Sequence, residues 1–185
     1  MKPLPSLAAI AAVATAFLAS PSHAALKVGA SAPEFTAPAY LAGEPFTYKL
    51  ADALKKGPVV LYFFPAAETK GCNLEAKLFA DATAEFKANG ATVIGVTSGN
   101  LDKLQAFSAD TEKCAGKFPV AADPGAKIAK SFDSVMAMKP DWSDRTSYVI
   151  SPAGQVVHVY SKMDPSQHVA ETLGAVKTWK ATHKK

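Results

Sequence analysis

Two cysteines, Cys72 and Cys114, are the only thiols in this chain of 185 residues. Cys72 follows Gly71 at the start of a segment with helical periodicity, shortly after an apolar stretch typical of a buried strand. The N-terminus of a helix offers unpaired backbone N–H groups and a partial positive charge, and both favour a thiolate over a thiol. Because the thiolate is the nucleophilic form of cysteine, this position favours covalent sulfur chemistry at Cys72. An inert, buried cysteine at a helix start is the alternative.

Two elements must position Cys72, one on each side of it. Residues 59–64 form a continuous apolar run with β-branched and aromatic side chains, which predicts a central strand covered on both faces. From residue 71 to 88 apolar side chains recur at helical spacing, with charged residues such as Glu75 between them, which predicts an amphipathic helix. Asn89 and Gly90 would end that helix. Cys72 would therefore lie where a buried strand gives way to a helix.

The remaining chain alternates between strand-like and helix-like patterns. We expect strands at 35–37, 46–48, 91–96 and 118–122, and helices at 50–56, from 101 to near Gly116, and from Asp123 onward. Residues 146–150 and 155–160 flank a four-residue turn and predict an antiparallel hairpin, after which Asp164 opens a last helix. This order predicts an α/β fold with a mixed central sheet flanked by helices. Cys114 would lie at the end of the helix that starts near residue 101.

The first 24 residues have the pattern of a secretory signal. Lys2 supplies a positive charge, residues 7–19 are apolar apart from one threonine, and small residues precede a cleavage point after Ala24. The apolar run is too short to span a bilayer comfortably. We therefore expect export to the periplasm or the medium, without a membrane association, as a single domain of residues 25–185. An uncleaved membrane anchor is the alternative.

Composition narrows the classes of function. The chain is 49% hydrophobic and 19% charged, as in ordinary globular proteins, and its net charge of +4 includes no basic block. These features exclude a disordered chain and give no support for nucleic-acid binding. The histidines have no spacing typical of a metal site, and no nucleotide-binding motif is present. We expect no metal and no bound cofactor.

The loop before Cys72 has the form P-x-x-x-T-x-x-C, from Pro65 through Thr69 to Cys72. Glu75 follows in the motif T-x-G-C-x-x-E, Phe118-Pro119 precedes Asp123-Pro124, and Arg145 stands directly before the predicted hairpin. With these motifs, most of the chain after residue 24 resembles the peroxiredoxins (AhpC/TSA-like proteins). It is most similar to their bacterioferritin-comigratory or Q-type subgroup. The resemblance implies a thioredoxin-like fold with an N-terminal β extension.

The resemblance also implies roles for four residues. Cys72 would attack a hydroperoxide and become a sulfenic acid, Thr69 and Arg145 would hold and polarise the peroxide, and Pro65 would shield the site from water. These roles agree with chemistry, since the reaction needs a thiolate and donors that stabilise the charge on the leaving oxygen. Taken alone, Thr69 could be a helix cap and Arg145 a surface charge.

The fate of the sulfenic acid depends on a second thiol. Lys77 stands where many Q-type members have a resolving cysteine. Cys114 is the remaining candidate, and it matches a less common variant with the resolving cysteine in the following helix. A disulfide brings two α-carbons within about 7 Å, so we expect helix ends to unwind before it forms. A one-cysteine enzyme reduced by an external thiol and a permanent structural disulfide remain open.

The leading expectation is therefore a thiol peroxidase, with hydrogen peroxide or a small organic hydroperoxide as substrate. A thioredoxin-like or other dithiol would be its external reductant, and it would be a monomer or a dimer. An exported thiol–disulfide exchange protein is one alternative, although Glu75 occupies the second cysteine position of C-x-x-C. A non-enzymatic thioredoxin-like domain stapled by Cys72 and Cys114 is the other, with Pro65, Thr69 and Arg145 present by coincidence.

Overall fold

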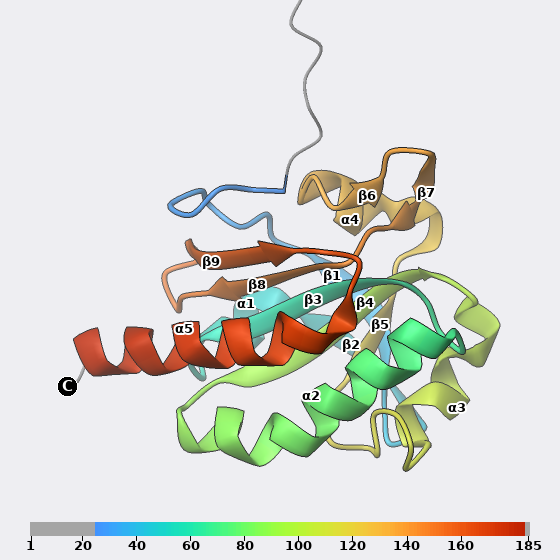
Figure 1. Ribbon diagram of the computed structural model, residues 1–185, viewed down its shortest axis with the longest axis horizontal. Helices are drawn as coiled ribbons and strands as arrows, with labels where there is room; N and C mark the ends of the chain where they lie inside the picture. Colours follow the sequence, from blue (N-terminus) through green and yellow to red (C-terminus); the bar gives the residue numbers. More distant parts are fainter. Residues whose placement is uncertain (1–24, 184–185) are drawn as a thin grey trace, which may run out of the picture.

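A seven-stranded mixed sheet lies at the centre of the protein, with helices on both faces (Figure 1). The computed structural model describes residues 25–183, so the predicted signal at residues 1–24 lies outside the described residues. The strands are β1 (Thr36–Leu41), β2 (Glu44–Lys49), β3 (Val59–Ala66), β4 (Thr92–Gly99), β5 (Val120–Ala122), β6 (Val135–Met136), β7 (Lys139–Ser143), β8 (Thr146–Ile150) and β9 (Val156–Ser161). The helices are α1 (Leu50–Leu54), α2 (Lys70–Ala88), α3 (Leu104–Ala109), α4 (Lys127–Ser131) and α5 (His168–Thr182). Across residues 25–183, no helix is long and apolar enough to cross a membrane.

The strand order confirms the predicted mixed sheet. The order is β2-β1-β5-β4-β3-β8-β9, with β3, β4 and β5 parallel and the other neighbours antiparallel. The β1–β2 hairpin joins the sheet through β1 and forms the N-terminal extension that the resemblance implies. β8 and β9 form the predicted hairpin, and β8 pairs with β3. The strand before Cys72 therefore lies directly beside the strand that follows Arg145.

Alternate side chains of β3 belong to two separate cores. Tyr62 and Phe64 face the side covered by α2, α3 and α5, whereas Leu61 and Phe63 face the side of α1 and α4. Tyr62 stacks on Phe79 of α2 with ring centroids 4.4 Å apart. Burying a large apolar side chain contributes about 1.5–3 kcal/mol. Packing on both faces explains why the whole strand is apolar.

Helix α2 begins and ends where the pattern predicts, within one residue. Thr69 has extended backbone angles before the first helical residue, Lys70, and Asn89 follows the last. Gly90 then takes a φ of +80°, a conformation that favours glycine and redirects the chain into β4. The Lys180 Nζ atom of α5 donates to the Ala88 carbonyl at 2.8 Å. In Figure 1, α2 and α5 lie across the same face of the sheet.

The helix predicted to run to Gly116 is much shorter, so the prediction for Cys114 is corrected. A 3-10 turn at Leu101–Lys103 leads into α3, which ends at Ala109. Asp110 has extended backbone angles, and its carboxylate accepts a hydrogen bond from the Glu112 amide at 2.8 Å. Such local side-chain bonds compete with helical hydrogen bonds. Cys114 therefore lies in a series of turns after α3 and is not in a helix.

Two smaller differences concern short elements. Residues 135–143 form the two-stranded ribbon β6–β7, which the sequence pattern does not predict. The Asp123 carboxylate accepts hydrogen bonds from the amides of Ile128 and Ala129, each at 2.9 Å. It therefore holds the first turn of α4, which starts at Lys127, three residues after Pro124. Pro124–Ala126 form a 3-10 turn before it, in which Gly125 and Ala126 take positive φ.

Candidate active site

Cys72 is the third residue of α2 and is almost fully buried, with 1% of its surface exposed. The Asn73 amide donates to the Thr69 carbonyl at 2.8 Å, and this hydrogen bond closes the first turn of α2, which contains Cys72. The amides of the first helical turn have no carbonyl partner earlier in the helix. Cys72 therefore lies at the positive end of α2, where the sequence places it, and the structure adds that it is buried there.

The Arg145 side chain contacts the Cys72 thiol directly. Its Nη2 atom donates to the Cys72 Sγ atom at 3.4 Å, although the two residues are 73 positions apart in sequence. Its Nε atom donates to the Met163 carbonyl at 2.9 Å, and its Nη1 atom donates to the Glu75 carboxylate. A Cβ atom on Gly71 would lie 3.1 Å from Nη2, so glycine leaves the guanidinium its space. The guanidinium is therefore fixed in place by contacts on three sides.

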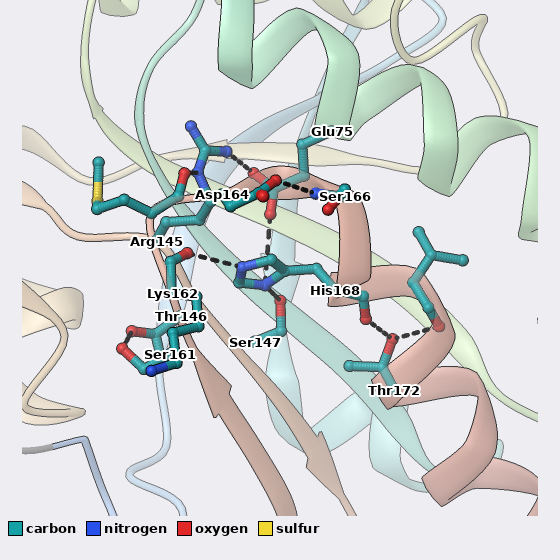
Figure 2. Close-up of polar contacts among 12 residues, drawn as sticks. Glu75, Arg145, Thr146, Ser147, Ser161, Lys162, Asp164, Ser166, His168 and Thr172 are labelled. Atoms are coloured by element: carbon teal, nitrogen blue, oxygen red, sulfur yellow. Dashed lines mark hydrogen bonds and ion pairs between the residues drawn. The ribbon is translucent and has the colours of Figure 1, made fainter.

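A series of buried polar contacts runs from Arg145 to His168, the first residue of α5. Figure 2 shows Glu75 between Arg145 and His168, with Ser147 beside the imidazole. The His168 Nδ1 atom lies 3.5 Å from Glu75 Oε1 and 2.7 Å from the Ser147 hydroxyl. The His168 Nε2 atom lies 2.9 Å from the Lys162 carbonyl. Glu75, His168 and Ser147 are all fully buried.

Burial shifts the pKa values of both Glu75 and His168. Burial raises the pKa of Glu75 to about 8, although the neighbouring Arg145 cation acts in the opposite direction. Burial likewise lowers the pKa of His168, since it disfavours the imidazolium. A fully ionised Glu75–His168 pair is therefore disfavoured near neutral pH.

Thr69 and Pro65 complete the loop in front of Cys72. The Thr69 hydroxyl donates to the Ala66 carbonyl at 3.1 Å and makes no capping bond to α2. Its proton is thus used within the loop, and its oxygen lone pairs are left to accept a hydrogen bond. Pro65 is the next-to-last residue of β3 and is buried, and its carbonyl accepts from the Thr97 hydroxyl at 3.1 Å.

An ion pair ties the active-site loop to the segment of Cys114. Glu68, which has a φ of +64°, accepts a hydrogen bond from Lys113 Nζ at 2.7 Å, and Asp110 accepts from the same atom at 2.8 Å. Cys114 follows Lys113 and is fully buried, and it belongs to the same core as Cys72. Both cysteines are free thiols. Burial raises the pKa of the Cys114 thiol far above its ordinary value, which keeps it protonated.

Sequence reasoning missed the inner half of this site. It placed Glu75 among the solvent-facing charges of α2, which is wrong because the side chain is fully buried against Arg145. It gave His168 no role. One signal was present: Glu75 shares the helical face of Cys72 and Phe79, at spacings of three and four residues, and a charge on a buried face needs a partner.

A buried thiol at a helix start, contacted by an arginine that directly precedes strand β8 in this α/β fold, is the arrangement that the resemblance to the peroxiredoxins implies. The AhpC/TSA family model matches residues 28–159. The chain therefore belongs to the AhpC/TSA family.

Relatives and solved structures agree with that family. Peroxiredoxin Q of Triticum aestivum chloroplasts is 34% identical over 120 residues, which cover 64% of this chain and 54% of the relative. The chloroplastic peroxiredoxin Q of Sedum lineare is 33% identical over 127 residues, which cover 68% of this chain and 67% of the relative. The matched part of the chain thus spans between about half and two thirds of these relatives.

The crystal structure of peroxidoxin BcpB from Mycobacterium tuberculosis superposes with a TM-score of 0.72 and 27% identity, covering 83% of this chain and 97% of that one. The reduced 2-Cys peroxiredoxin of Plasmodium vivax, at 21% identity, gives a TM-score of 0.74 and covers 85% of this chain and 99% of that one. These likenesses confirm the thioredoxin-like fold.

Proposed function

We propose that this protein is a thiol peroxidase that reduces hydrogen peroxide and small organic hydroperoxides at Cys72. The observation that carries the proposal is the Arg145 Nη2 donor 3.4 Å from the Cys72 sulfur at the N-terminus of α2. Both the helix end and the guanidinium stabilise a thiolate. Membership of the AhpC/TSA family supports the same reaction.

The reaction follows from these positions. The Cys72 thiolate attacks the terminal oxygen of R–O–O–H, so that an S–O bond forms as the O–O bond breaks. The alkoxide that leaves takes up a proton and becomes an alcohol, or water in the case of hydrogen peroxide. Sulfur is thereby oxidised to a sulfenic acid, and the peroxide is reduced. Arg145 would stabilise the developing charge on oxygen, and Thr69 would accept a hydrogen bond from the substrate.

Cys114 would resolve the sulfenic acid. Once its segment opens and the thiol is no longer buried, the Cys114 thiolate would attack the Cys72 sulfur, so that the S–S bond forms as the S–O bond breaks and the leaving hydroxide takes up the thiol proton as water. An external dithiol would then reduce the disulfide. The Glu68–Lys113 ion pair supports this step because it holds the two cysteine-bearing segments together. Cys114 lies in turns, so less regular structure must open on its side than a helix would require.

One equivalent of hydrogen peroxide added to the reduced protein tests both steps. We expect a mass lower by about two hydrogens and no free thiol, because the disulfide removes both thiol protons. Amide exchange should differ between the reduced and oxidised forms mainly at residues 69–77 and 108–116. Strand β3 is buried on both faces and should stay protected in both forms.

The other readings give different results in the same experiment. A one-cysteine enzyme gains about one oxygen in mass, retains one thiol and shows equal exchange in both forms. That result would remove Cys114 as the resolving residue while leaving Cys72 as the reactive one. A structural disulfide shows no reactive thiol before reduction and no peroxide consumption after mild reduction.

We further propose that the chain is exported and cleaved after Ala24. The apolar run at residues 7–19 and the small residues before the cleavage point support this proposal. Residues Ala25 and Leu26 pack against the core on the α1 side, so the cut would fall just before the packed chain. Expressed in a Gram-negative host, the protein should appear in the periplasmic fraction with Ala25 as its first residue. Recovery of the uncleaved chain from membranes or cytosol would contradict export.

A further inference from the structure

His168 and Glu75 face each other in the core with atoms that would repel in their simplest charge states. The Nε2 atom of His168 lies 2.9 Å from the Lys162 carbonyl, and because a carbonyl only accepts, Nε2 carries a proton. In a neutral imidazole, Nδ1 is then an acceptor. Nδ1 accepts from the Ser147 hydroxyl at 2.7 Å, and it also faces Glu75 Oε1 at 3.5 Å, which is an acceptor too when the carboxylate is ionised.

Glu75 Oε1 is also a buried oxygen without a hydrogen-bond partner among the described residues. The other carboxylate oxygen, Oε2, accepts from Arg145. An ionised oxygen left without a donor in a fully buried site costs considerable free energy. One additional proton on this pair gives Oε1 a partner, either as a donor on His168 Nδ1 or as a proton on Oε1 itself, and the Ser147 hydroxyl can rotate to suit because it both donates and accepts.

We propose that His168 is a positioning residue that shares one buried proton with Glu75, and that this proton leaves the charge of Arg145 free to stabilise the Cys72 thiolate. The inference rests on the proposed function only for its use in peroxide reduction. With the proton present, Arg145, Glu75 and His168 carry one net positive charge. Without it, the Glu75 carboxylate neutralises Arg145, and the neighbouring thiolate loses that support.

Other charged and titratable groups surround the pair from every packed element. Tyr62 of β3 lies near both Glu75 and Cys72, and burial raises its pKa, which keeps it neutral. The Tyr160 ring of β9 packs edge-on against His168, with centroids 4.8 Å apart. Asp164 and Glu171 favour the imidazolium electrostatically, whereas burial and Arg145 oppose it. None of these contacts supplies a donor to Glu75 Oε1.

The rate of Cys72 alkylation as a function of pH tests the proposal without any peroxide. Cys114→Ser serves as the background, because Cys72 is then the only thiol in the chain. In this background, Glu75→Gln keeps Arg145 free of a neighbouring carboxylate at every pH, as the shared proton does, so the profile should not move to higher pH. His168→Gln removes the partner that favours the proton-bound state and adds an amide donor to the carboxylate. That profile should move to higher pH by about one unit, or about tenfold in rate at a fixed pH below the midpoint.

A double variant shows whether His168 acts through Glu75. If it does, Glu75→Gln combined with His168→Gln should have the profile of Glu75→Gln alone, since no titrating carboxylate remains. His158→Gln is the matched control, because His158 lies 3.4 Å from Glu171 in a different contact and 27% of its side chain is exposed. Its profile should equal that of the background. Unchanged alkylation in His168→Gln, or an equal shift with glutamine at position 75, would overturn the proposal.

A second measurement keeps Glu75 and His168 unchanged, so it tests the proposal even if the substituted proteins misfold. The imidazole nitrogen resonances of His168 should titrate with a midpoint that falls once Cys72 is alkylated, because the thiolate charge that favours the shared proton is then lost. An identical midpoint before and after alkylation would overturn the proposal. Absence of peroxide consumption would instead remove the proposed function and leave these two results interpretable.

Discussion

Replacing Cys72 by serine is expected to abolish peroxide consumption, with a loss of more than about a thousandfold in turnover. A serine hydroxyl is not ionised near neutral pH, and neither the start of α2 nor Arg145 can make it a comparable nucleophile. Stopped-flow peroxide consumption with a dithiol reductant in excess measures the loss. Serine is close in size to cysteine, so the fold should be retained.

Cys114→Ser is the matched control for that variant. It should keep the first oxidation of Cys72 and stop at the sulfenic acid, because the resolving thiol is absent. A probe specific for sulfenic acid should then label residue 72 in this variant and neither cysteine position in Cys72→Ser. Labelling of Cys114 ahead of Cys72 in the unaltered protein would sink the assignment of both residues.

Replacing Arg145 by methionine is expected to have the second largest effect. The thiolate of Cys72 should form at higher pH, because the nearest cation in the described contacts is gone. The rate per thiolate should also fall by about 10²–10³-fold, as for loss of one donor to a developing oxyanion. Stopped-flow rates across a pH series separate the two effects, since the first moves the midpoint and the second lowers the plateau.

Two further variants show what the guanidinium contributes. Arg145→Lys should restore the plateau only in part, because an ammonium cannot reach Cys72, Glu75 and the Met163 carbonyl together. Lys70→Met removes an exposed charge two residues before Cys72 and should change little, because water and salt screen it. Equal profiles for all three variants and the parent would place Arg145 outside the site.

The parts of the fold that were predictable are those fixed by local patterns. The apolar run of β3 and the helical stripe of α2 each specify one kind of element, and Gly90 ends α2 with a conformation that suits glycine. The end of α3 was not predictable in this way. The Asp110 carboxylate ends that helix through bonds to its own neighbours, and composition alone does not distinguish it from a solvent-facing helical aspartate.

The residues of the candidate active site also differ in how far local sequence predicts their positions. Cys72 and Thr69 belong to one short motif, so their placement follows from the sequence around them. Glu75 lies in the same motif, but neither its burial nor that of His168 follows from local sequence, because the contacts that justify it come from residues far away in the chain. Charged side chains on an amphipathic helix usually face the solvent. Glu75 is buried instead because it pairs with Arg145, which is distant in sequence.

The presence of a separate core on each face of the sheet has a consequence for engineering a more heat-resistant form of the protein. Cys72 and Cys114 lie in the core on the α2 and α5 side, together with Tyr62 and Phe79. The opposite core, which includes Leu61, Ile94 and Phe132, contains neither cysteine. Volume-conserving changes there usually cost little and can improve packing. Thermostability could therefore be raised from that side while the geometry of the reactive thiol is left as it is.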